Sequence, residues 1–496
     1  MSIEELQKEV TRLQEENRLL QFAKTRAEEK LKDLLRRFFG PKSEKMDPAQ
    51  LRLALESIQS DENLVEEEPP APSVVEALPR KRQGGGRRPV PVNLPLVREV
   101  IDVPESERMG MEKIWEEVTE EIDYRPSQFI RRQIVRPVYA SKSKDQAPVQ
   151  APAPKRVIPG SGVGAGLIAH VLVSRFCDHL PYYRLEQIAA RQGVTIDRQK
   201  MSTWVEHAAV LLKTVYDQLR NAVLKSGYVQ IDETPISVID PERDGVTRKG
   251  WLWAYHAPTA SALVFDFNLS RGQESPKSFF ESQGAGVIQT DGYGVYPVVF
   301  GGRKDIEHAG CMAHARRMWV NANESGDAAA PAVLAEIQKL YRIEAEIRDA
   351  SPQERSAVRE SRSTLVMANL HRLCQQTLAQ ALPASATGRA ASYMLDRWPQ
   401  LELFTKPNMG HVLIDNNPVE RGIRPTAIGR KNWLFLGHPT AGWRTAVIYS
   451  IIGSCKLAKV NPYEYLVWAL QRLATATTAD VGLVTPLDYL AVKEQR

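Results

Sequence analysis

The sequence predicts a multidomain protein of the α+β class, and three patterns along its 496 residues favour this class. The first forty residues carry a heptad repeat of apolar side chains, which is typical of a coiled coil. Strand-like apolar runs begin at Tyr228, and two of them carry an aspartate. A long stretch of helical periodicity then separates these strands from a further acidic motif.

The composition excludes several classes of protein. Hydrophobic residues make up 43% and charged residues 25% of the chain, which excludes wholesale disorder. No apolar run reaches the roughly 18 residues that span a bilayer, so no membrane contact is expected. The four cysteines lack a framework spacing, which argues against a secreted disulfide protein. We therefore expect a cytoplasmic protein, whose net charge of +5 is compatible with nucleic acid as a partner.

Residues 1–39 follow an a/d seam in which steps of three and four residues alternate, and Gly40 and Pro41 end it. Asn17 and Lys24 fall on a positions, where a polar side chain fixes the register, most often of a parallel dimer. We expect a coiled coil that makes the protein a homo-oligomer, at least a dimer. The alternative is an amphipathic helix that packs on its own chain.

Two linkers flank a small β-rich unit. Residues 40–95 form a polar, Pro-rich linker that ends in a basic Gly/Arg stretch. Arg87 and Arg88 in that stretch are candidate minor-groove contacts, although a solvated basic linker has the same composition. Alternating apolar residues over 96–140 predict the β unit, and residues 141–160 form a second linker.

Residues 161–225 read as a helical region that contains a helix-turn-helix over Tyr183–His207. Gly193 suits the end of its first helix. Arg198 and Lys200 would lie on the second helix, where such side chains meet phosphates and base edges. An ordinary helical hairpin inside a larger domain is the alternative.

The first part of a candidate catalytic domain occupies residues 226–325, where three strands in quick succession predict an antiparallel meander. A short helix and a fourth strand follow. Asp232 lies inside the first strand and Asp291 ends the fourth. The strands are predicted at Tyr228–Val238, Trp251–Tyr255, Ala262–Phe267 and Gly286–Asp291, and the helix at Pro276–Gln283.

An aspartate in a core strand is costly unless it is paired or bound to a metal ion. Two carboxylates that converge repel each other, and divalent cations relieve that repulsion. Mg²⁺ prefers oxygen ligands, and two such ions support in-line phosphoryl transfer. Asp232 and Asp291 are therefore candidate metal ligands, while a turn at the end of a strand is the structural alternative for either residue alone.

A third acid lies far along the chain. Residues 326–405 predict an all-helical insertion, and residues 406–460 complete the catalytic domain. Asn416 or Asn417 caps a short helix with Pro418 in its first turn, so that Glu420 lies in the opening turn. Asp415 is a rival for metal contact or capping. Residues 461–496 predict a C-terminal helical segment.

Basic residues follow Glu420 and are interleaved with Trp433 and Phe435. Phosphate contacts and stacking are the functional interpretation, and a solvated surface is the alternative. The candidate DNA-binding residues of this stripe are Arg421, Arg424, Arg430 and Lys431.

Taken together, the motifs resemble the insertion sequence sixty-six family of bacterial DDE transposases, and the resemblance extends over nearly the whole chain. The matching motifs are Asp232-Glu233-Thr234-Pro235, Asp291-Gly292-Tyr293, Cys311 to Arg317, Asp415-Asn416-Asn417 through Glu420-Arg421, Gly429 to Phe435, and Asn461 to Leu466.

The resemblance implies a ribonuclease-H-like catalytic fold, with Asp232, Asp291 and Glu420 as catalytic and metal-binding residues. It implies two Mg²⁺ or Mn²⁺ ions, and DNA strand cutting and joining at element ends and target. It also implies a nucleoid-associated bacterial protein, with possible accessory proteins encoded by the same element. A DNA-binding regulator with a relic catalytic fold and a structure-selective nuclease are the alternatives.

One departure concerns zinc. Members of the family commonly carry a four-cysteine zinc-binding unit after the basic stretch, but residues 96–140 contain no cysteine, so no zinc is expected there. Cys311 and His314 have a spacing that can bind zinc, but two ligands do not make a site. We therefore expect Cys311, His314 and Asp415 to lie around the three acids and to contact the residues that position them.

Overall fold

The computed structural model describes residues 128–132, 134, 138–139, 149–150, 153–243, 245–281, 286–325, 327–476 and 482–495. The chain divides into two units, Met1–Tyr124 and Arg125–Arg496, and the described residues all belong to the second. The predicted coiled coil, the first linker with Arg87 and Arg88, and most of the predicted β unit lie outside the described residues. A two-residue ladder joins β1 (Val138–Tyr139) to β2 (Val149–Gln150), which falls within the predicted second linker.

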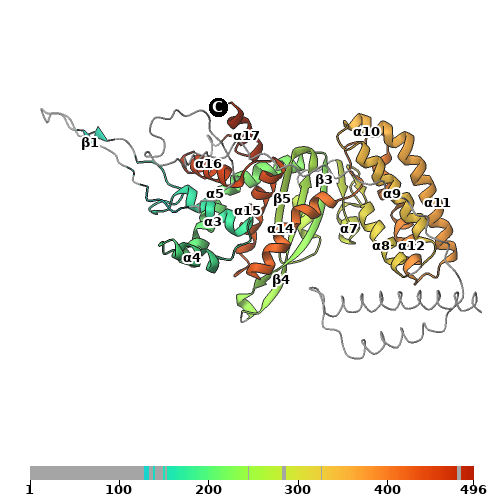
Figure 1. Cartoon of the computed structure of the whole chain (residues 1–496), viewed down its shortest axis with the longest axis horizontal. Coiled ribbons are helices and arrows are strands. Elements are labelled where there is room, and N and C mark those ends of the chain that lie inside the picture. Colours follow the sequence, from blue (N-terminus) through green and yellow to red (C-terminus); the bar gives the residue numbers. More distant parts are fainter. Residues whose placement is uncertain are drawn as a thin grey trace, which may run out of the picture. The chain divides into compact units, whose positions relative to one another are not determined.

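A five-stranded sheet forms the centre of the second unit (Figure 1). Its strands are β3 (Tyr228–Ile239), β4 (Thr247–Ala257), β5 (Ala262–Asn268), β6 (Gly286–Gln289) and β7 (Ile306–Ala309), in the order β5-β4-β3-β6-β7. The first three strands pair antiparallel as the predicted meander, whereas β6 joins β3 and β7 joins β6 in parallel.

The central strand β3 extends beyond its partner β6, which pairs only with Tyr228–Gln230. Pro235 lies in this extension, where proline is tolerated because β6 no longer requires a backbone donor. The segment after α14 takes over that side of β3. Leu436 exchanges backbone hydrogen bonds with Ser237 (2.8 Å) and Ile239 (2.9 Å).

Helices from both ends of the described chain enclose the meander. They share with the sheet one core cluster, which includes Leu172, Leu212, Trp253, Phe265 and Ile448. They are α3 (Ala165–Phe176), α4 (Tyr182–Arg191), α5 (Arg198–Leu224), α14 (Asn417–Trp433), α15 (Ala441–Leu457), α16 (Pro462–Thr475) and α17 (Pro486–Glu494).

Helix α15 covers the edge strand β5 with hydroxyl groups as well as apolar side chains. Ser450 Oγ accepts the backbone N–H of Phe265 (2.7 Å), and Ser454 Oγ accepts that of Leu263 (3.1 Å). Unpaired donors of an edge strand invite pairing with another chain. These serines satisfy two of them within the protein.

The predicted helix-turn-helix corresponds to α4 and α5, but the second helix is much longer than expected. It runs for 27 residues and buries Met201, Leu212 and Leu219 along one side. The reason is that its apolar spacing continues past His207 into the shared core. The short helix expected at Pro276–Gln283 is α6 (Glu274–Phe279), and α7 (Val295–Phe300) follows β6.

The helical insertion builds a second core cluster, which includes Trp319, Leu340, Leu370 and Met394. Helix α8 lies within residues 226–325, the predicted first part of the catalytic domain, but it contributes to this cluster as well. The helical elements of this part of the chain are α8 (Met312–Glu324), α9 (Ala330–Glu346), α10 (Pro352–Val358), the π-helical turn η4 (Arg359–Ser363), α11 (Thr364–Gln380), α12 (Ala386–Asp396) and α13 (Trp398–Glu402).

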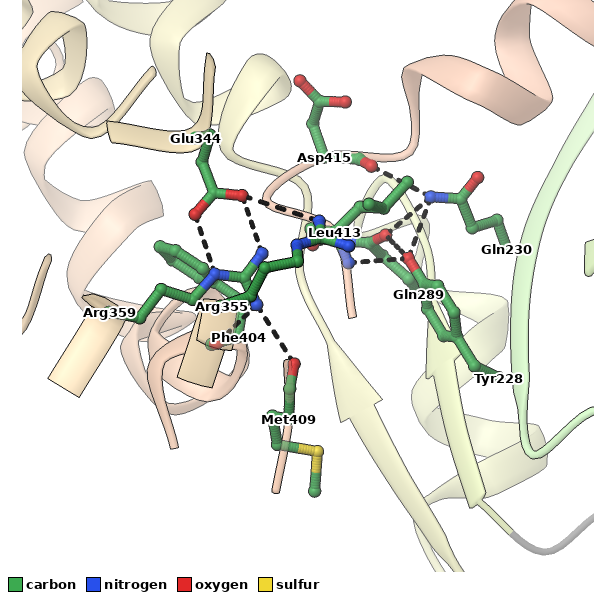
Figure 2. Close-up of polar contacts among 10 residues, drawn as sticks. All are labelled: Tyr228, Gln230, Gln289, Glu344, Arg355, Arg359, Phe404, Met409, Leu413 and Asp415. Atoms are coloured by element: carbon green, nitrogen blue, oxygen red, sulfur yellow. Dashed lines mark hydrogen bonds and ion pairs between the residues drawn. The ribbon is translucent and has the colours of Figure 1, made fainter. Parts of the chain in front are cut away.

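A fully buried arginine joins the parts of this insertion (Figure 2). Arg359 donates two hydrogen bonds to the carboxylate of Glu344 in α9, with Nε–Oε1 and Nη2–Oε2 distances of 2.8 and 2.7 Å. Its Nη1 donates to the carbonyls of Phe404 and Met409, both at 3.1 Å. Paired forks of this kind combine charge with fixed geometry. Arg359 therefore ties the insertion to the segment that leads back to the sheet.

Candidate active site

Asp232 lies in β3, and Asp291 follows the end of the neighbouring parallel strand β6, which stops at Gln289 rather than at Asp291 as predicted. Gln230 on β3 is paired with Gln289 on β6, and each aspartate follows its glutamine by two residues. Each aspartate uses Oδ1 to accept a nearby backbone N–H, at 2.9 Å in both cases. In the part of the chain that the structure describes, Oδ2 of neither aspartate has a hydrogen-bond partner. One oxygen of each carboxylate is thus left for a ligand.

Glu420 lies in the first turn of α14, after the N-cap residue Asn416. The prediction of a short helix is wrong, because α14 has 17 residues and contains Pro425 in its interior. Proline removes one helical hydrogen bond. The continuous buried face, which includes Val419, Ile423 and Thr426, keeps the helix intact beyond it.

Buried polar atoms without partners surround Glu420. Its Oε1 lies 3.8 Å from His314 Nδ1, and neither atom makes a hydrogen bond with any described residue. The side chain of Asn416 is fully buried, and both its Oδ1 and its Nδ2 are likewise unsatisfied. Such atoms are costly in a folded protein unless water or a ligand meets them. These atoms are therefore candidates for contact with water or a ligand at this end of the site.

The three acids act on one another electrostatically. The pKa of Asp232 is raised to about 8, first by burial and then by the negative charges of Glu233, Asp291 and Glu420. A set of carboxylate oxygens with excess negative charge is the donor set that Mg²⁺ and Mn²⁺ prefer. Among the described residues, no group of three or more His, Cys, Asp or Glu side chains is already arranged to hold a metal ion.

The raised pKa of Asp232 predicts how stability depends on pH when no divalent cation is present. Because its pKa of about 8 exceeds the usual value of 3.8, the folded state holds a proton that the unfolded state has lost. The free energy of unfolding should therefore fall as pH rises from about 4 to about 8 and level off above 8. Each pKa unit corresponds to about 1.4 kcal/mol, so the loss is on the order of a few kcal/mol.

Urea unfolding in EDTA at a series of pH values measures this slope. Asp232→Asn should flatten it, and Mg²⁺ should restore stability mainly above neutral pH. An unchanged slope in the variant would mean that Asp232 ionises freely in the folded chain.

A residue of the helical insertion forms a hydrogen bond to the segment that begins α14. Tyr341 on α9 donates its hydroxyl to Asp415 Oδ2 at 2.8 Å. The same carboxylate accepts the backbone N–H of Asn417 at 3.1 Å and its side-chain amide at 2.7 Å. Cys311 Sγ accepts the Asn416 backbone N–H at 3.5 Å, and burial raises the pKa of its thiol to about 12. Asp415 and Cys311 thus contact the residues that begin the helix of Glu420.

A buried polar network connects the two aspartate strands to the same segment (Figure 2). Gln230 Nε2 donates to the carbonyl of Asp415 at 2.9 Å, and Gln289 Nε2 donates to that of Leu413 at 2.8 Å. Tyr228 donates its hydroxyl to Gln289 Oε1 at 2.6 Å and accepts the Leu413 N–H at 3.1 Å. The sheet positions two residues before each aspartate therefore fix the chain that leads to Glu420.

The predicted DNA-binding residues fall into three groups. Arg198 and Lys200 are exposed in the first turn of α5, and Arg87 and Arg88 lie outside the described residues. Along α14, Arg421, Arg424 and Lys431 are exposed.

Two members of the predicted basic and aromatic stripe are engaged within the protein. Arg430 donates to Thr234 Oγ1 at 3.1 Å and to the carbonyl of Pro235, both on β3. Trp433 is buried, so it offers no ring for stacking, whereas Phe435 is 39% exposed.

Sequence reasoning missed an arginine near the aspartates. Arg271, just after β5, donates from Nε (2.9 Å) and Nη2 (2.7 Å) to Glu233 Oε1. Tyr296 donates its hydroxyl to Glu233 Oε2 at 2.7 Å. Glu233 could have been suspected because it follows Asp232 directly, but no sequence pattern links Arg271 to either residue.

Comparison with known proteins matches the sequence of this chain to a family. A model described as "Transposase IS66 family" matches residues 160–444, a range that contains the sheet, the insertion and all three acids. The chain belongs to this transposase family. A model described as "Transposase C of IS166 homeodomain" matches residues 26–100, and one described as "IS66 C-terminal element" matches residues 450–481.

Relatives in Sinorhizobium fredii (strain NBRC 101917 / NGR234) share much of the length. The protein printed as "Uncharacterized protein y4jD" is 32% identical over 430 residues, which cover 83% of each chain. "Uncharacterized protein y4qI" is 32% identical over 487 residues, which cover 92% of this chain and 88% of the relative.

Membership in the IS66 family implies a transposase with DNA as its partner. The N-terminal match spans residues 26–100, which include the last part of the predicted heptads and the basic Gly/Arg stretch. Within the described part of the chain, no helix is both long and apolar enough to cross a membrane.

Proposed function

We propose that this IS66 transposase cuts and joins DNA strands at the ends of its element, with Asp232, Asp291 and Glu420 as the catalytic carboxylates. The observation that carries the proposal is the pairing of Gln230 on β3 with Gln289 at the end of β6, two residues before Asp232 and Asp291, while the side chains of the same two glutamines hold the segment that leads to the Glu420 helix. The order of the five strands supports a ribonuclease-H-like catalytic domain with a helical insertion.

Asp232, Asp291 and Glu420 would hold two Mg²⁺ or Mn²⁺ ions, which when bound activate the attacking oxygen and stabilise the leaving oxygen of an in-line displacement. The free oxygens of the aspartates and the unsatisfied Glu420 Oε1 fit such ions. Until cations bind, Asp232 keeps its proton at neutral pH, because its pKa is raised to about 8. His314 and Asn416 present polar atoms beside Glu420 that can orient water or DNA oxygens.

The reaction would occur in two displacements. In the first, water attacks the phosphodiester at the element end and frees a 3′-hydroxyl. In the second, that hydroxyl attacks a phosphodiester of the target. Arg421, Arg424 and Lys431, exposed along α14 just beyond Glu420, would hold neighbouring phosphates. The predicted coiled coil would bring two chains, and so two ends, together, and accessory proteins of the same element would join them.

A duplex that carries one end of the encoding element tests the proposal. Purified full-length protein should nick it and join it to a target plasmid with Mg²⁺ or Mn²⁺ but not with Ca²⁺. Nicks without joined products would identify a structure-selective nuclease instead. Binding without any cleavage would identify a DNA-binding regulator with a relic catalytic fold.

A further inference from the structure

Arg271 lies beside the proposed active site, outside the motifs singled out in the sequence. It follows β5, and its guanidinium reaches Glu233, the residue after Asp232, through two hydrogen bonds to Oε1. The same guanidinium lies 3.9 Å from the ring centroid of Tyr293, the second residue after Asp291. Arg271 therefore contacts a residue that lies within two positions of each aspartate.

The guanidinium is fixed on several sides. Besides Tyr293, the ring of Trp251 lies 4.9 Å from it, and such stacking orients the guanidinium plane. Glu233 is itself held, since its side chain is only 1% exposed and its Oε2 accepts the Tyr296 hydroxyl. Few conformations remain open to this arginine.

One edge of the fixed guanidinium faces solvent. The Arg271 side chain is 42% exposed. Nε and Nη2 are used by Glu233, and Nη1 makes no hydrogen bond with any of the described residues. A guanidinium edge of this kind is suited to a phosphate oxygen.

Charge explains why a phosphate binder is needed at this place. Glu233, Asp291 and Glu420, joined by Asp232 once it loses its proton, concentrate negative charge that repels a DNA backbone. The positive charge of Arg271 offsets the negative charge of Glu233. Its unpaired edge is available to the DNA backbone near Tyr293. Its exposed position allows DNA to reach it.

We propose that Arg271 binds a backbone phosphate of the DNA strand next to the bond that is cut, with Glu233 as its positioning residue. This inference rests on the proposed function, since it assumes that DNA enters at the two aspartates. The proposed phosphate contact comes from the end of the edge strand β5 and is separate from the basic residues of α14.

Binding to the element-end duplex, measured with Ca²⁺ so that the DNA stays intact, tests the assignment. Single methylphosphonate linkages, which remove one phosphate charge, are placed in turn around the cleavage position. Wild-type protein should lose about tenfold in affinity at one linkage, as expected for a charged hydrogen bond. Arg271→Gln should lose the response at that linkage, and its slope of log affinity against log salt should become shallower by about 0.9.

Arg362→Gln is the matched control. Arg362 is 49% exposed and pairs with Glu346 at 2.6 Å on the helical insertion, so its loss should change neither the slope nor the linkage pattern. Arg271→Lys keeps the charge but not the planar edge, so it should keep the slope and lose part of the discrimination. Glu233→Gln should weaken the same discrimination, and this effect should vanish when Arg271 is already Gln.

An Arg271→Gln protein that keeps both the slope and the linkage pattern would overturn the assignment. So would an equal change in the Arg362→Gln control. Failure of the proposed function is distinguishable, because it would appear as cleavage that survives Asp232→Asn, whatever Arg271 does.

Discussion

Asp232→Asn should abolish strand joining and reduce DNA cleavage by several orders of magnitude, while end binding stays within a few-fold of wild type. Asparagine keeps the shape of the side chain and can still accept the Glu233 backbone N–H through its amide oxygen. It cannot supply the negative oxygen that a divalent cation requires. Gel-resolved nicking and joining of the end-bearing duplex with Mg²⁺ measures the effect, and titration with Ca²⁺ present measures binding.

Asp266→Asn is a closely matched control. Asp266 lies on β5 and also accepts the N–H of the next residue through Oδ1, at 2.9 Å, while Ser275 donates to its Oδ2 at 3.1 Å. Burial raises its pKa, as it does that of Asp232. The control should keep strand joining. Loss of DNA binding together with catalysis in Asp232→Asn alone would point to a structural role for that acid.

Arg359→Met should give the largest loss of stability. The substitution leaves Glu344 without its paired fork and leaves the carbonyls of Phe404 and Met409 unsatisfied (Figure 2). Breaking a buried ion pair by removing one partner costs about 3–5 kcal/mol. We expect the Tm to fall by roughly ten degrees, and hydrogen exchange to accelerate first in α9 and in the segment near Met409.

Arg362→Met provides the comparison for this change. Arg362 lies three residues after Arg359 and pairs with Glu346, which is on α9 like Glu344. Both side chains of this pair are about half exposed. Exposed pairs of this kind contribute about 0–1 kcal/mol. If both variants unfold at the same temperature, the buried fork does not hold the insertion together.

Much of the sheet could be predicted from the sequence because its strands carry a strong local pattern. The meander, the strand before Asp291 and the helix that carries Glu420 all appear where apolar alternation and capping residues indicated them. Local patterns failed where distant packing decides the outcome. The Glu420 helix was expected to be short, yet its buried face continues past Pro425.

The contacts around the acids were beyond sequence reasoning for a similar reason. Glu233 and Arg271 meet across 38 positions, and Tyr341 meets Asp415 across 74. No periodicity of a single helix or strand encodes such pairs, since each depends on how the whole sheet and insertion assemble. Arg430 was identified as a basic residue of α14, but its contact with β3 follows only from the three-dimensional placement of that helix.

The order of the acids along the chain also determines when a newly made protein can first form the proposed active site. Asp291 leaves the ribosome 129 residues before Glu420. At about 5–20 residues per second, that interval lasts roughly 6–26 seconds. During it, the insertion helices can assemble, but the third acid is still missing. Synthesis alone thus imposes a delay between the second acid and the third, and the site cannot be complete before that interval has passed.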